Sequence, residues 1–320
     1  MVSSLFIFSF KMKKFIIDVS LFSLILLLVL IVGAVLPTTP RASESLLFAK
    51  TEKDILLKNV SSPRIILVGG SNLSFGINSN ILKDSLKISP INTAIHAGLG
   101  LEFMMDNTIQ YIQKGDIVIL APEYNHFYGR LIHGQEELLR TIADMEPLRI
   151  MSLKKEQLRN IVKFIPKYSF SKFKPTEYYG YIVNHIYSVN SFNQYGDVYT
   201  HWELGQQEFN PDGVIGESYN PKAIKLITQF QLELENKGAK LLVTYPSYQA
   251  SSYDMNVDKI KKIEQEFFKN GFVVLGTPER YRMSNNLMFN TSYHLLKKGA
   301  DYRTHLLVQD IKEKLVNNKL

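Results

Sequence analysis

The chain has 320 residues, of which 45% are hydrophobic and 21% are charged, so it has the composition of a globular protein rather than a disordered one. It contains no cysteine, which excludes disulfide bonds, a cysteine nucleophile and thiolate metal sites. The net charge of +7 is modest, and we interpret the basic residues as spread along the chain, without the dense stripe that a nucleic-acid-binding protein needs.

The amino terminus has the pattern of a membrane-spanning segment. Three lysines at positions 11–14 precede a stretch from Val19 to Leu36 that is 18 residues long, free of charge and rich in Leu, Ile and Val. This length suffices to cross a bilayer core, and the lysines are expected to stay in the cytoplasm. We therefore expect a basic cytoplasmic segment at 1–14, a transmembrane signal anchor at 15–37 and a domain outside the cytoplasm. A cleaved signal peptide is the alternative interpretation.

A linker at 38–60, which becomes a short amphipathic helix, leads to the most informative stretch of the sequence. Residues 64–68 form a run rich in Ile and Val that ends at Gly69 and Gly70 and is followed by Ser71. Such a run is typical of a buried parallel strand. A serine just beyond that strand lies where open α/β sheets bind ligands, which makes Ser71 a candidate nucleophile. Taken alone, the motif is better explained as a turn followed by a helix cap.

Strands and helices alternate from this point. Further strands are expected at 91–95 and 116–121, with helices at 77–86 and 101–113. Alternation of this kind predicts a right-handed parallel βαβ series.

The alternation stops at about residue 127 and resumes at about 220, which we interpret as an insertion at the ligand end of the sheet. Its aromatic stretch from Tyr178 to Trp202 is interpreted as insertion core in preference to a sugar-stacking platform. The remaining elements are strands at 240–245 and 272–275 and helices at 221–237, 256–270 and 299–316. Together they predict an α/β fold: a three-layer α/β/α sandwich with a parallel, flavodoxin-like sheet of about five strands.

Catalysis by a serine nucleophile needs a base, usually histidine, that a third group orients. His294 follows the last strand in a turn that enters the final helix, so it is expected to return to the sheet edge that carries Ser71. His96 and His126 lie at the ends of the second and third strands and are reserve candidates. The sequence has no phosphate-binding loop, no His-Glu-x-x-His and no dinucleotide-binding motif, so we expect neither a cofactor nor a metal.

These motifs together resemble the SGNH (GDSL-like) hydrolase superfamily, especially its membrane-anchored branch associated with surface polysaccharides and the cell wall. The resemblance covers about residues 62–126 and 238–318. Its nucleophile block matches Gly69 to Asn72, its glycine block matches Asn92 to Gly100, and its final block matches Asn290 to Gly299. We therefore assign 61–320 as an SGNH hydrolase-like domain.

The resemblance implies a role for each matching residue. Ser71 is the expected nucleophile and His294 the expected base, while Gly98 or Gly100 supplies an N–H group to the oxyanion hole. The family's third block usually supplies an asparagine, and here the nearest amide after the third strand is Asn125.

The acid position of the final block holds an amide, Asn290. An amide oxygen can accept a hydrogen bond from an imidazole N–H, but it cannot stabilise an imidazolium by charge. Three interpretations remain open: a weak dyad, a substituting carboxylate (Asp301 or Glu123), or a degenerate site.

By this resemblance, the chain is expected to hydrolyse an ester or to transfer an O-acyl group, most simply acetyl, on a surface or secreted polysaccharide. The expected partners are an acylated glycan or cell-envelope polymer, the membrane, and an integral-membrane acyl donor protein. The expected location is a single-pass membrane protein with its domain in the periplasm or at the cell surface. The alternative is a catalytically degenerate relative that binds glycan or helps to assemble a polysaccharide-modifying membrane machine.

Overall fold

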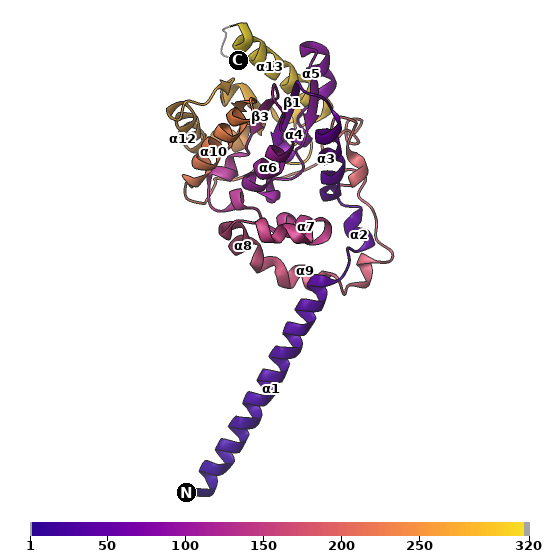
Figure 1. The fold of residues 1–320 in the computed structure, drawn as a ribbon, viewed down its shortest axis with the longest axis vertical. Helices are drawn as coiled ribbons and strands as arrows, with labels where there is room; N and C mark the ends of the chain where they lie inside the picture. The colour runs from indigo at the N-terminus through magenta and orange to yellow at the C-terminus, as the bar shows by residue number, and fades with distance from the viewer. Residues whose placement is uncertain (1, 317–320) are drawn as a thin grey trace.

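The first helix, α1 (Val2–Val35), extends away from the rest of the chain in the computed structural model, which describes residues 2–316 (Figure 1). The 25 residues from Lys11 to Val35 are long and apolar enough to span a membrane, and apart from Gly33 near their end they are not buried within the structure. At about 1.5 Å per residue, such a stretch is about 37 Å long, compared with about 30 Å for a bilayer core.

Five parallel strands form the central sheet, in the order β2-β1-β3-β4-β6, which confirms the predicted fold class. Their bounds are β1 Arg64–Gly69, β2 Ser89–Asn92, β3 Ile117–Ala121, β4 Lys240–Thr244 and β6 Val274–Leu275. The sequence did not predict the small parallel pair of β5 (Tyr248–Gln249) and β7 (Arg282–Met283).

The first strand shows why these residues form a buried sheet. Every residue of β1 is buried, and its side chains alternate between two cores. Ile66 and Val68 join the larger core, whereas Ile65 and Leu67 join the smaller one. Because successive side chains of a strand point to opposite faces, a continuous apolar run is needed when helices cover both faces.

Helices on both faces complete the three layers. The smaller core includes residues of α5 (Ser79–Leu86) and α13 (Lys297–Val316). The larger core includes residues of α3 (Ala49–Asn59), α6 (Leu101–Thr108), α10 (Lys222–Asn236) and α12 (Val257–Lys269). The chain outside the 127–220 segment also contains three short helices: α2 (Pro40–Ser43), α4 (Ser71–Ser74) and α11 (Ala250–Met255). The expected linker at 38–60 is thus mostly helical, and its α3 packs on the body.

The second strand lies two residues earlier than predicted and ends at Asn92 rather than at residue 95. Beyond Asn92, side chains take over the hydrogen bonds that a neighbouring strand would make. The Ala94 carbonyl accepts from the Ser74 hydroxyl at 2.6 Å and also from the buried Lys53 ammonium. The apolar composition of residues 91–95 therefore predicted a strand that extends three residues too far.

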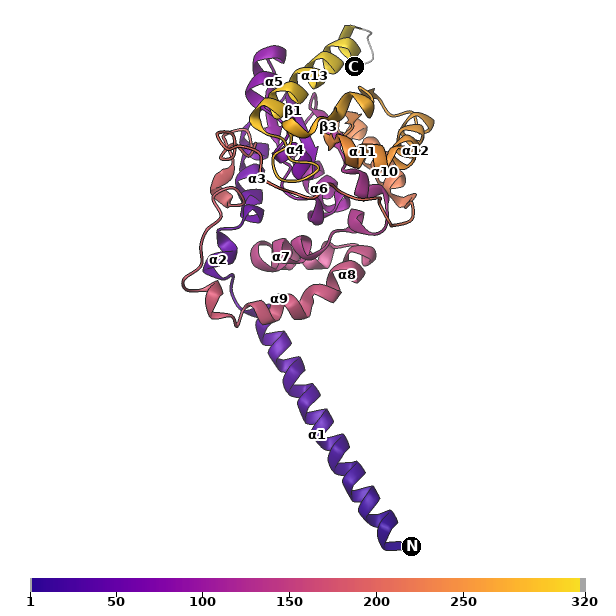
Figure 2. The same cartoon turned by 180° about the vertical axis from the view of Figure 1, so that it is seen from behind.

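The segment between about 127 and 220, which interrupts the alternation of strands and helices, contains α7 (Glu136–Met145), α8 (Lys155–Ile161) and α9 (Ile165–Ser171). Figures 1 and 2 both place α8 and α9 at the end of the body from which α1 leaves. Helix α9 packs against α1 so closely that a Cβ atom on Gly33 would lie 2.5 Å from the Ser169 carbonyl oxygen. The Lys172 ammonium donates to the Pro37 carbonyl at 3.2 Å and pairs with Asp144 at 2.6 Å, which ties the end of α1 to α7.

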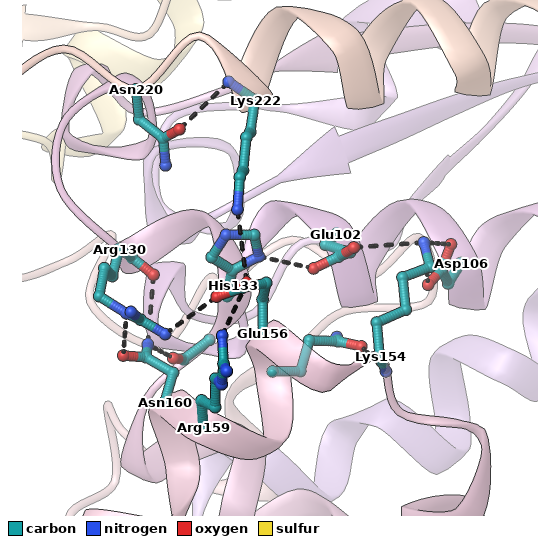
Figure 3. Close-up of polar contacts among 12 residues, drawn as sticks. Glu102, Asp106, Arg130, His133, Lys154, Glu156, Arg159, Asn160, Asn220 and Lys222 are labelled. Carbon is teal, nitrogen blue, oxygen red and sulfur yellow. Dashed lines mark hydrogen bonds and ion pairs between the residues drawn. The ribbon is translucent and has the colours of Figure 1, made fainter.

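A polar network attaches this segment to the body (Figure 3). The His133 imidazole contacts the Glu102 carboxylate of α6 at 2.8 Å, and both side chains are buried. The Asn160 amide donates to the Arg130 carbonyl at 3.2 Å. More exposed ion pairs join Glu156 to three cations: Arg130, Arg159 and Lys222. The inserted helices are therefore fixed relative to the sheet.

One buried ion pair joins the starts of the two central strands. The Arg64 guanidinium binds both oxygens of Asp116, at 3.1 and 2.6 Å, and both side chains are fully buried. Arg64 also donates to the carbonyl groups of Val60 and Tyr111, at 3.1 and 2.9 Å. The charges are thus compensated, and removing one partner would leave the other buried and unpaired.

We predict that Asp116→Asn lowers the free energy of unfolding by about 3–5 kcal/mol, because the Arg64 charge loses its counter-ion inside the protein. Urea unfolding in detergent, followed by circular dichroism, measures the change. Arg282→Gln is the control, since it breaks the exposed Arg282–Asp254 pair, and we expect no measurable effect. Equal stability of the two variants would contradict this assignment.

Candidate active site

Ser71 lies directly beyond the carboxyl end of β1, where the chain turns into α4. The two preceding glycines allow this close approach. A Cβ atom on Gly69 would lie 2.6 Å from the Ala121 carbonyl oxygen, and one on Gly70 would lie 2.6 Å from the Glu123 carboxylate. The Gly-Gly-Ser sequence is therefore required by packing at the sheet edge as well as by the turn.

The Ser71 hydroxyl donates to Oε1 of Glu123 at 3.3 Å. The Asn72 backbone N–H donates to the same oxygen at 3.1 Å, so Glu123 is held against the start of α4. Glu123 is buried and comes from the segment that follows β3. The carboxylate that the sequence suggested as a substitute acid thus contacts the serine.

His126 supports the Glu123 backbone. Its Nδ1 accepts from the Glu123 N–H at 3.1 Å, and its Nε2 lies 3.1 Å from the Ala97 carbonyl oxygen. These partners require a proton on Nε2 alone. Burial lowers the pKa of His126, which favours that neutral state. His126 is thus a positioning group in this structure.

His294 lies in the loop before α13, and its ring is held by an amide. Nδ1 is 2.9 Å from Oδ1 of Asn290, while the Asn290 Nδ2 donates to the Tyr187 hydroxyl at 2.8 Å. Because an amide oxygen only accepts, Nδ1 carries the proton, and the lone pair of Nε2 remains available. This is the tautomer that a general base for serine requires.

Aromatic side chains enclose the same imidazole. Phe75 stacks on it with ring centroids 4.0 Å apart and planes 7° from parallel. The His201 ring also packs on Phe75, with ring centroids 5.0 Å apart. Burial first, and then repulsion from His96 and His201, lower the pKa of His294 to about 3. No carboxylate opposes this shift, so His294 is neutral at ordinary pH.

Ser71 and His294 line one pocket of about 630 Å³, a typical size for a small-molecule site. Gly98, Asn125 and Glu123 line it as well. Within residues 2–316, Ser71 and His294 share no direct hydrogen bond, because the Ser71 hydroxyl is turned toward Glu123.

The backbone and side-chain groups of the other predicted residues are bound to partners other than Ser71 and His294. The Gly98 N–H donates to Nδ1 of His96 at 3.0 Å, so it must be released before it can bind an oxyanion. The Gly100 N–H donates to the Ala97 carbonyl at 2.9 Å, and Gly100 does not line the pocket. Asp301 binds the side chains of Asn78 and Lys297, at 2.7 and 2.6 Å, rather than His294.

Three of the pocket residues that the sequence did not identify contact the candidate catalytic side chains or add charge. Phe75 is the stacking partner of His294, Tyr187 joins the Asn290 network, and Asp212 adds a second carboxylate beside Glu123. Burial raises the pKa of Asp212, whose oxygen accepts from the Tyr248 hydroxyl at 3.3 Å. Tyr187 belongs to the aromatic stretch that we interpreted as core, and it had no distinguishing signal. No lysine or arginine lines the pocket within the described chain.

The described residues contain no group of three or more His, Asp or Glu side chains arranged to hold a metal ion. The side chains that line the pocket offer hydroxyl groups, imidazoles, amides and carboxylates.

Comparison with known protein families and with curated protein sequences found no match. Among solved structures, protein YxiM from Bacillus subtilis is similar over 79% of this chain, with 12% sequence identity and a TM-score of 0.37. The match covers 57% of YxiM, so this chain spans little more than half of that protein's length.

Proposed function

We propose that the chain is a membrane-anchored enzyme of the SGNH (GDSL-like) type that removes or transfers an O-acyl group, most simply acetyl, on a surface or secreted polysaccharide. The observation that carries this proposal is the shared pocket of Ser71 and His294, in which Asn290 fixes the proton of His294 on Nδ1. The order of the elements and the three sequence blocks support the family assignment.

In this proposal, Ser71 first rotates away from Glu123. Its Oγ then attacks the ester carbonyl while Nε2 of His294 accepts the hydroxyl proton. The tetrahedral oxyanion is bound by the Ser71 N–H and by the Gly98 N–H, which leaves His96. The alcohol departs with the proton from His294, and an acyl-serine remains. Water or a second hydroxyl then attacks the acyl group, returns a proton through His294 and frees Ser71.

The character of the pocket supports a neutral, hydroxyl-rich substrate. Glu123 and Asp212 can accept hydrogen bonds from sugar hydroxyl groups, whereas they would repel an anionic substrate. Tyr187 and Tyr293 add aromatic surface. The apolar helix α1 supports a single-pass anchor. Because the lysines that precede its apolar stretch are expected to stay in the cytoplasm, the domain would lie in the periplasm or at the cell surface.

A non-catalytic role as a glycan-binding or assembly partner is the second candidate. The contact between Ser71 and Glu123 favours it, because a carboxylate beside the nucleophile opposes a developing oxyanion. The amide at position 290 also removes the charge that would stabilise an imidazolium.

We predict that the full chain in detergent hydrolyses 4-nitrophenyl acetate and that Ser71→Ala reduces kcat by at least about 1,000-fold, because the nucleophile is lost. The exposed Ser152→Ala is the matched control and should retain full activity. Glu123→Gln should retain activity if His294 is the base. Equal rates for wild type and Ser71→Ala would favour the non-catalytic candidate, and complete loss in Glu123→Gln would make Glu123 the base.

We predict that Asn290→Asp raises the pKa of His294, because a carboxylate 2.9 Å from Nδ1 stabilises the imidazolium. In the wild type, the acidic limb of kcat/KM should lie below the ordinary histidine pKa of about 6.5. In the variant it should move up by at least about one pH unit, and kcat should rise at least about tenfold. Initial rates between about pH 3 and 8 measure both changes.

Asn286→Asp is the matched control, since it adds the same charge at an exposed position of the neighbouring turn. The pH window needs one precaution. Because the folded pKa of His294 is lowered to about 3, its contribution to stability is complete above about pH 6.5 and is lost as the pH falls toward 3. Circular dichroism at each pH therefore accompanies the assay. An unchanged limb and rate in Asn290→Asp would exclude His294 as the base.

A further inference from the structure

The excess positive charge of the protein is concentrated in one short segment. Between Pro147 and Lys174 lie eight of the 37 lysines and arginines but only one of the 30 acidic residues. The rest of the chain is therefore balanced, and this segment alone accounts for the net charge of +7. The expectation that the charge is spread along the chain was wrong.

The same segment exposes large apolar side chains. We call the exposed part of residues 147–174 the basal surface. Its apolar members are Leu148, Ile150, Met151, Val162, Phe170 and Phe173, of which Leu148 and Met151 are 77% and 79% exposed. Its exposed basic members are Lys154, Lys155, Arg159, Lys163, Lys167 and Lys174. Apolar side chains interspersed with lysine and arginine are typical of segments that lie in a membrane interface.

The buried contacts of α9 show which way the basal surface faces. The Tyr168 hydroxyl donates to Asp144 of α7 at 2.7 Å, so this side of α9 points into the body. Phe170 follows two residues later, about 200° around the helix axis, and is exposed. In α8, Asn160 and Ile161 are buried, whereas Val162 in the turn that follows is exposed. The exposed side chains of α8, of α9 and of the turn between them therefore point away from α7.

The position of α1 places this surface at membrane depth. Gly33, in the last turn of α1, packs directly against Ser169 of α9. The charge-free stretch of α1 that begins at Val19 is about as long as a bilayer core, so the last turn of α1 lies at the interfacial region when the helix spans. Figures 1 and 2 show α8 and α9 extending sideways from that end of α1. The basal surface is thus continuous with the membrane-spanning helix.

We propose that the basal surface docks onto a lipid bilayer that contains anionic lipid, so that the domain rests on the membrane. Apolar side chains such as Met151 and Phe170 enter the boundary between headgroups and acyl chains, and the lysines bind the anionic headgroups. This inference goes beyond catalysis and rests on the membrane anchor in the proposed function. Helix α7 packs on α8 and α9, and Gln135, the residue before α7, lines the pocket. Docking of the basal surface therefore fixes the height of the pocket above the bilayer.

The absence of cysteine from the sequence allows single fluorescent labels to test docking in the full chain. Met151→Cys and Phe170→Cys report on the basal surface, and Leu26→Cys reports on insertion of α1. Phe268→Cys and Tyr302→Cys are matched controls, since these side chains are 61% and 51% exposed on α12 and α13, far from α1. Each variant carries a nitrobenzoxadiazole label and is reconstituted into vesicles that contain an acyl-chain spin-label quencher.

In vesicles of phosphatidylcholine with 30% phosphatidylglycerol, we expect quenching at positions 26, 151 and 170 but not at 268 or 302. The combined change Lys155→Gln, Lys163→Gln and Lys174→Gln should lower the docked-to-undocked ratio by about 100-fold, because each cation contributes roughly a fivefold factor. The matched change Lys261→Gln, Lys262→Gln and Lys269→Gln, at exposed positions of α12, should have no effect.

Quenching at position 26 without quenching at 151 and 170 would overturn docking and leave the anchor intact. A lack of quenching at all three positions would overturn both. Docking that persists equally in pure phosphatidylcholine would also contradict the proposed role of anionic lipid. Esterase turnover in detergent is measured separately, so a failure of docking is distinguishable from a failure of the catalytic proposal.

Discussion

The pairing of Gly69 with Ala121 across β1 and β3 is the constraint on which the candidate site depends. Two residues beyond each partner come Ser71 and Glu123, and their side chains meet at 3.3 Å because the strands are parallel and in this register. The absence of side chains at Gly69, which faces the Ala121 carbonyl, and at Gly70, which faces the Glu123 carboxylate, permits the contact. The buried Arg64–Asp116 pair fixes the same two strands at their other ends. Ser71 is thus positioned by sheet geometry before any loop contributes.

The electrostatics of the site differ from those of a charged triad. Burial and neighbouring histidines keep His294 neutral, and Asn290 orients the ring without adding charge. Carboxylates are present, but Glu123 contacts the serine and Asp301 binds Lys297. A base of low pKa is a weak proton acceptor, so the arrangement suits slow turnover of a reactive ester better than fast hydrolysis. Within the described residues, no lysine or arginine lines this pocket, and the excess positive charge lies on the segment from 147 to 174.

Most of the fold could be predicted from the sequence, whereas the site could be predicted only in part. Apolar runs such as 64–68 and 117–121 identified the sheet because both of its faces are buried. The approach of Ser71 and His294 to one pocket could be predicted because each follows a strand at a glycine or turn motif. Phe75 and Tyr187 were not, since their roles depend on contacts between segments distant in sequence. The end of the second strand was also missed, because side-chain hydrogen bonds to Ala94 replace strand pairing.

The most direct test of the central claim is covalent labelling of the full chain with a fluorophosphonate, followed by intact-mass and peptide analysis. An activated serine displaces fluoride from the probe, so we predict one adduct per chain, located on the peptide that contains Ser71. The adduct should be absent from Ser71→Ala and should form more slowly in His294→Ala. Failure to label folded wild-type protein at Ser71, or equal labelling of Ser71→Ala, would contradict the account.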